Sequence, residues 1–112
     1  MNSYLYESAR DLANKIIESE EYQNYKACRC AVEEEGLQNQ VDEFRTEAFR
    51  LQCQGADTYQ REIGYLKERY SSILEHHAVR DYLDAEINLC RTMQIIQGIL
   101  VENIDLKLDF LN

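Results

Sequence analysis

Apolar residues recur along this chain at intervals of three and four, the spacing that places side chains on one side of a helix. Alternation typical of a strand occurs only in residues 105–112, which fit a strand, a continued helix or a flexible tail equally well. The chain is therefore predicted to be all-α with five helices. The pattern places them at Tyr4–Ile17, Glu20–Glu34, Leu37–Gln54, a stripe from Tyr59 to Ile73, and Val79–Ile104.

Residues with strong positional preferences mark the ends of these helices. Ser19 and Asp57 are predicted N-caps of the second and fourth helices. Gly36 is placed to end the second helix in a left-handed conformation, and Gly55 to end the third. Because the third and fourth helices carry matched apolar stripes on either side of a short glycine turn, they are predicted to form an antiparallel hairpin.

The last helix carries more apolar surface than one neighbouring helix can cover. Residues 93–101 are apolar on more than one face, and a chain of 112 residues has few other residues with which to bury them. A two-fold homodimer built on this helix is therefore predicted. The predicted interface consists of Leu89, Met93, Ile96 and Leu100.

Length and charge restrict the classes of protein to consider. A chain of 112 residues is predicted to be a single domain over residues 1–112. Its 21 acidic and 12 basic residues give a net charge of -9, which disfavours direct binding of nucleic acid and favours a basic partner. It contains no apolar run of about 20 residues and no signal-peptide pattern, so a cytoplasmic protein without membrane insertion is expected.

Four cysteines raise the question of a metal site. Cys28 and Cys30 are two residues apart on a helix and point about 200° away from each other, so they cannot share one ion. Cys28 on an apolar face and Cys90 beside the last seam are predicted to be buried structural thiols, with no metal or cofactor. The alternative is a metal or iron–sulfur carrier whose cysteines come together in the oligomer.

One carboxylate of the last helix lies on its apolar seam. Glu86 interrupts an apolar seam, and burying its charge is costly unless a partner compensates it. It either forms an ion pair with a basic residue such as Arg45, or it is a partner-binding carboxylate on a surface that is not core.

Further candidate partner-binding residues are acidic or aromatic. Three negative charges near the C-terminus of the second helix oppose its macrodipole, so they form either a solvated acidic turn or a docking patch for a basic partner. Tyrosine, at eight residues, is the dominant aromatic type and is enriched at protein interfaces. The candidates are Glu33, Glu34, Glu35, Tyr22, Tyr25 and Tyr82.

Motifs of known enzymes are absent from the sequence. It contains no glycine-rich phosphate loop, no nucleophile elbow and no HExxH. A protein without catalytic activity is therefore predicted.

Three segments in order resemble the YlbF/YmcA family: Ser19-Glu-Glu-Tyr-Gln-Asn-Tyr-Lys26, Phe44-Arg45 and Val79-Arg-Asp-Tyr-Leu-Asp-Ala-Glu86. The resemblance runs from about Tyr4 to Ile104. It implies a small, all-helical, cytoplasmic bacterial regulator of competence, sporulation and biofilm formation. It also implies complexes with family relatives and with RNA-processing machinery that includes a ribonuclease. The clustered C-terminal cysteines associated with iron–sulfur clusters in some members are missing, since Cys90 stands alone.

Overall fold

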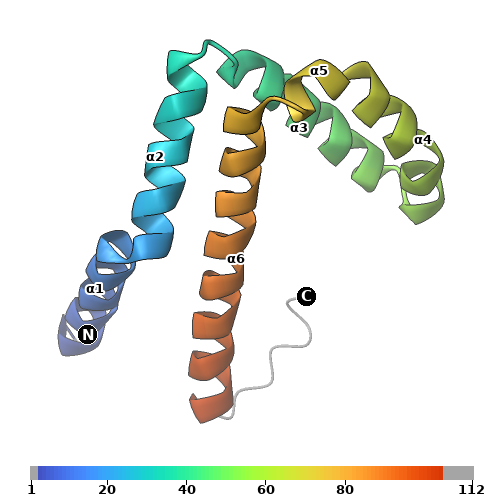
Figure 1. The fold of residues 1–112 in the computed structure, drawn as a ribbon. Coiled ribbons are helices and arrows are strands. Elements are labelled where there is room, and N and C mark those ends of the chain that lie inside the picture. Colours follow the sequence, from blue (N-terminus) through green and yellow to red (C-terminus); the bar gives the residue numbers. More distant parts are fainter. Residues whose placement is uncertain (1–2, 105–112) are drawn as a thin grey trace. The chain divides into compact units, whose positions relative to one another are not determined.

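The computed structural model describes residues 3–104, which form helices joined by short turns (Figure 1). The described part of the chain contains no strand, which confirms the predicted all-α class. The alternatives for residues 105–112 lie outside the described residues. The helices are α1 (Ser3–Glu18), α2 (Glu20–Glu34), α3 (Gln38–Cys53), α4 (Ala56–Arg69), α5 (Ser71–Leu74) and α6 (His77–Ile104).

The prediction of one continuous fourth helix through Ile73 is wrong. α4 ends at Arg69, Tyr70 adopts φ −102° and ψ 19°, and α5 follows as a separate single turn. Ser71 and Ser72 favour this break, because serine hydroxyls compete with the hydrogen bonds of a helix interior. The described part of the chain therefore has six helices instead of five.

The turn after α2 has the predicted left-handed glycine. Gly36 has φ +72°, its N–H donates to the Glu33 carbonyl at 3.0 Å, and the Leu37 N–H donates to the Val32 carbonyl at 3.1 Å. These two bonds form a Schellman motif, which satisfies carbonyls at the helix end and brings Leu37 next to Val32. The motif ends α2 and redirects the chain into α3.

The N-cap prediction is confirmed for α2 and wrong for α4. The Ser19 hydroxyl accepts the Tyr22 N–H at 3.3 Å, which confirms Ser19 as the N-cap of α2. Asp57 is not the N-cap of α4, because Gly55 occupies that position with φ +111° and Asp57 lies in the first turn. There its negative charge still suits the positive end of the helix dipole.

The chain divides into two compact units. Unit 1 comprises residues 1–25 and 84–112, and its described residues form α1, the start of α2 and most of α6. Unit 2 comprises residues 26–83 and contains the rest of α2, all of α3, α4 and α5, and the start of α6.

Unit 2 has the well-developed core. α3 and α4 lie side by side in the predicted hairpin, and Phe44 meets Tyr70 edge-on with ring centroids 5.6 Å apart. Removing such side chains from water is the main favourable term for a small helical unit. The buried side chains of unit 2 are Val32, Val41, Leu66, Ala78, Val79 and Tyr82.

Unit 1 buries much less. Ala85 is the only buried residue among its described residues, and α1 contributes none. Its large apolar side chains on α1 and α6 remain partly or mostly exposed.

Candidate functional site

Arg45 and Tyr82 form the main polar contact in the core of unit 2. The Arg45 guanidinium carbon lies 5.0 Å from the centroid of the Tyr82 ring, and Nη1 donates to the Tyr82 hydroxyl at 3.5 Å. Tyr82 is only 2% exposed, so the structure places this candidate partner-binding residue in the core. Glu86 is half-buried, and its ion pair with Arg45 stays a prediction.

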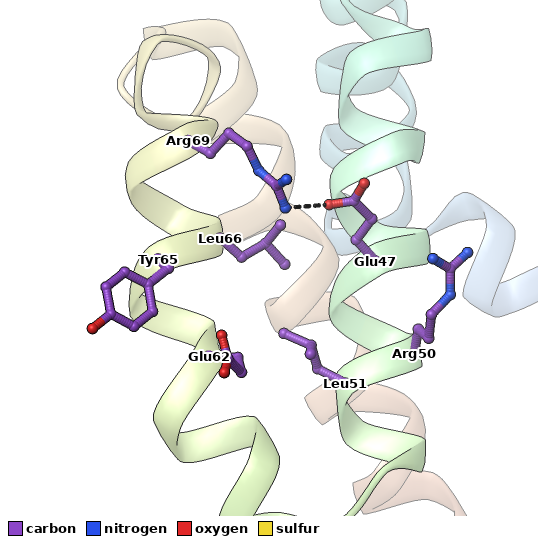
Figure 2. Close-up of a pocket in the computed structure, with 7 residues that line it drawn as sticks. All are labelled: Glu47, Arg50, Leu51, Glu62, Tyr65, Leu66 and Arg69. Atoms are coloured by element: carbon purple, nitrogen blue, oxygen red, sulfur yellow. Dashed lines mark hydrogen bonds and ion pairs between the residues drawn. The ribbon is translucent and has the colours of Figure 1, made fainter.

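A groove of about 520 Å³ runs between α3 and α4 (Figure 2). Leu51 and the buried Leu66 form its apolar floor. Arg69 reaches across from α4 to Glu47 on α3, with Nη2 2.9 Å from Oε2. This site was not predicted from the sequence, because the rotation of each helix about its axis decides which charged residues of α3 and α4 face each other. Arg50, Glu62 and Tyr65 complete the lining.

Glu47 also affects the tyrosine at the end of α4. Desolvation raises the pKa of Tyr70 above its ordinary value, and the negative charges of Glu47 and Glu43 raise it further. Hydrogen bonding toward Glu47 is a further and smaller cause of the raised pKa of Tyr70, because it favours the neutral phenol. Glu47 thus pairs with Arg69 and also raises the pKa of Tyr70.

The predicted acidic turn lies on the surface of unit 2. Glu33, Glu34 and Glu35 are all exposed, as both the solvated turn and the docking patch require. Oε2 of Glu35 lies 3.9 Å from Nε2 of His76. His76 in turn uses Nδ1 to accept the Ala78 N–H at 3.2 Å, which caps the start of α6.

Two candidate partner-binding tyrosines lie on one face of α2. Tyr22 and Tyr25 are both half-buried, with ring centroids 6.3 Å apart and planes inclined by 44°. Their partly exposed rings have the amphipathic character used at protein interfaces.

The four residues of the predicted dimer seam differ in exposure. Leu89 and Ile96 are half-buried, whereas Met93 and Leu100 are exposed. Other apolar residues of α6, which were not predicted to belong to the interface, are also exposed: Ile87, Ile95, Ile99 and Ile104.

The four cysteines are all free thiols. Partial burial, followed by the negative charge of Asp81, raises the pKa of the Cys28 thiol above its ordinary value. The prediction that Cys90 is buried is wrong, because this residue faces solvent on the less covered part of α6. Residues 3–104 contain no group of three or more potential ligands placed to hold a metal ion. The exposed cysteines are Cys30, Cys53 and Cys90.

Within residues 3–104, each helix is too short or too polar to traverse a lipid bilayer.

The six helices of the described residues define a small all-α protein. Residues 5–105 match the family described as control of competence regulator ComK, YlbF/YmcA. The chain belongs to this family, which is linked to the control of competence.

Curated relatives match over nearly the same length. The UPF0342 protein of Desulfitobacterium hafniense is 30% identical, with 89% of this chain and 84% of the relative covered. The UPF0342 protein of Caldicellulosiruptor saccharolyticus is 29% identical, with 92% of this chain and 89% of the relative covered. The UPF0342 protein of Symbiobacterium thermophilum is 27% identical, with 95% of this chain and 98% of the relative covered. No solved structure matches the chain.

Proposed function

We propose that this protein is a non-catalytic regulatory adaptor that acts in the cytoplasm by binding other proteins. It takes part in the control of competence, to which its family is linked, and in related programmes such as sporulation and biofilm formation. Its partners are family relatives and a ribonuclease complex, and it does not bind nucleic acid directly.

Exposed apolar surface is the observation that carries this proposal. Twelve large apolar side chains of the described residues are at least 40% exposed, on α1, α3, α4 and α6. Groups of exposed apolar side chains, such as Met93, Ile95, Ile99 and Leu100 within eight residues of α6, are typical of proteins that bind other proteins. The exposed Glu33, Glu34 and Glu35 add a negatively charged patch that suits a basic partner surface.

The test is affinity capture of the tagged full chain from its own cytosol, with and without nuclease, followed by mass spectrometry. The expected result is recovery of family relatives and a ribonuclease in both samples, because the contacts are between proteins. Loss of the ribonuclease after nuclease treatment would show that RNA bridges the two and would contradict direct binding.

A variant with Glu33→Gln, Glu34→Gln and Glu35→Gln tests the acidic patch within the same experiment. If the patch docks a basic partner, this variant recovers less of that partner, while the amount of variant protein is unchanged. Recovery of the tagged chain alone would contradict the adaptor function. Purified protein with the brown colour of an iron–sulfur cluster would favour the carrier function instead.

A further inference from the structure

The α3–α4 hairpin carries the exposed large apolar side chains of unit 2. These are Phe49, which is 66% exposed, and Tyr65, which is 71% exposed. Tyr65 lines the groove between the two helices, on the α4 side (Figure 2). Aromatic side chains that stay in water beside a groove are typical of surfaces that bind another protein.

A second, shallower hollow continues the groove along α3. Its volume is about 450 Å³, and Glu47 and Arg50 line both the hollow and the groove. Phe49 lies beside this hollow, because it is seven residues from Asp42 and within about 20° of it around the helix axis. The groove and the hollow together form one surface, from Asp42 on α3 to Tyr65 on α4, which we call the hairpin surface.

The hairpin surface has an excess of unpaired negative charge. Arg69 and Glu47 neutralise each other across the groove, with Nη2 2.9 Å from Oε2. The other charged side chains of this surface form no ion pair with any described residue. Because these are three carboxylates and one guanidinium, the surface is complementary to a partner with an excess of lysine and arginine. They are Asp42, Glu43, Glu62 and Arg50.

We infer that the hairpin surface binds an amphipathic helix of a basic partner protein. A groove between two helices accepts the apolar side of a third helix, and Leu51 and Leu66 supply the apolar floor for it. The lysine and arginine side chains of the bound helix then lie next to the unpaired carboxylates, and its apolar side chains cover Tyr65. The inference rests on the adaptor function, because it names one surface and one partner chemistry through which that function acts.

Charge argues against a second copy of this chain in the groove. A two-fold contact brings the same patch of both copies together, so Glu43 and Glu62 would face a surface with the same excess of carboxylates. Each copy also carries a net charge of -9, and like charges across an interface weaken association. The hairpin surface is separate from the acidic turn at residues 33–35, none of which lines the groove or the hollow.

Photo-cross-linking of the tagged full chain in its own cytosol tests this inference. Tyr65→p-benzoylphenylalanine keeps an aromatic side chain at a position that is 71% exposed, and irradiation joins it to the molecule that occupies the groove. Mass spectrometry then identifies the cross-linked segment. The expected segment belongs to another protein, has apolar residues at helical spacing, and contains more lysine and arginine than aspartate and glutamate.

Three outcomes of the cross-linking would overturn the inference: a cross-link to a second copy, a cross-link to a segment without excess positive charge, and no cross-link. Affinity capture separates this failure from a failure of the adaptor function. If capture still recovers partners when Tyr65→p-benzoylphenylalanine forms no cross-link, the adaptor function stands and only the hairpin surface is refuted. If neither experiment recovers a partner, both proposals fall.

Charge reversal on α4 tests the role of the carboxylates. The cross-linked segment is synthesised with a fluorescent label and titrated with the full chain, and fluorescence anisotropy gives its dissociation constant. Glu62→Lys replaces attraction by repulsion inside the groove and should raise this constant about tenfold or more. Added salt should also raise it for the wild type, because salt screens the attraction.

Glu68→Lys is the matched control. It makes the same change of charge on the same helix, and Glu68 is exposed like Glu62. Glu68 does not line the groove and lies about 120° around the helix axis from Glu62. This control should change the dissociation constant by about threefold or less, because solvent and salt screen charges outside the contact. Equal effects of the two substitutions would refute binding in the groove.

Discussion

Truncation of Tyr82 distinguishes a core residue from a partner-binding residue. Tyr82 is 2% exposed and lies under the Arg45 guanidinium at 5.0 Å. Removing a buried aromatic side chain costs about 3–5 kcal/mol, because apolar contacts are lost and a cavity remains. We therefore expect Tyr82→Ala to lower the free energy of unfolding by about 3–5 kcal/mol.

Two milder substitutions separate the parts of this contact. Tyr82→Phe keeps the ring beneath Arg45 and loses only a hydroxyl contact of 3.5 Å, at the outer limit of hydrogen bonding, so it should cost less than about 1 kcal/mol. Tyr82→Leu also loses the cation–π contact and ring volume, and it should cost about 1–3 kcal/mol. The order Phe, Leu, Ala is the expected order of destabilisation.

Urea unfolding followed by far-ultraviolet circular dichroism measures these differences at one fixed protein concentration, since association would change apparent stability. Tyr65→Ala is the control: Tyr65 is 71% exposed, and its removal should change stability by about 0.5 kcal/mol or less. A loss below about 1 kcal/mol for Tyr82→Ala, with helicity intact, would refute the core assignment.

Three further predictions concern a turn, a titration and a thiol. Gly36→Ala should lower stability by about 1–2 kcal/mol in urea unfolding, because Gly36 has φ +72°, whereas Gly64→Ala inside α4 should raise it by up to about 1 kcal/mol. Because the pKa of Tyr70 is raised in the folded state, its contribution to stability is complete below pH about 10 and is lost as pH rises through the folded pKa. Glu47→Gln should lower the pKa of Tyr70 toward its ordinary value in an ultraviolet titration. Cys28 should react more slowly with iodoacetamide at pH about 8 than the three exposed cysteines, as mass spectrometry can follow.

Each of these predictions has a result that contradicts it. Equal effects of Gly36→Ala and Gly64→Ala would mean that the left-handed backbone at residue 36 carries no penalty. An unchanged Tyr70 titration in the Glu47→Gln variant would remove Glu47 as a cause of the shift. Alkylation of Cys28 at the rate of the exposed cysteines would show that its thiol is neither shielded nor raised in pKa.

Local features of the fold were predictable because they depend on residues close together in the sequence. Ser19 and Gly36 act within one helical turn of their own positions, and both were assigned correctly. The break at Tyr70 was not predicted, because the apolar stripe continues through it to Ile73 while the backbone does not. An apolar stripe in the sequence indicates which face of a helix is apolar, but it does not indicate where the helix is briefly interrupted.

Contacts between helices were less predictable. The sequence suggested Arg45 as one basic partner for Glu86, an ion pair that stays a prediction, and gave no sign that Arg45 also lies on the ring of Tyr82. The bridge from Arg69 to Glu47 was not foreseen. Both contacts depend on how far each helix is rotated about its axis, and a long arginine side chain reaches several alternative partners from one position.

The sequence by itself determined the helical class, because apolar periodicity and end-capping residues act over a few positions and need no distant contact. It also determined the excess of apolar residues in the last helix, because that excess depends only on which residue types the segment contains. Only the tertiary structure decided which apolar residues are covered: unit 2 buries Val32, Val41 and Val79 completely, while Ala85 is the one buried residue among those of unit 1 that the structure describes. Burial requires atoms from other helices, and their positions depend on the packing of the whole chain.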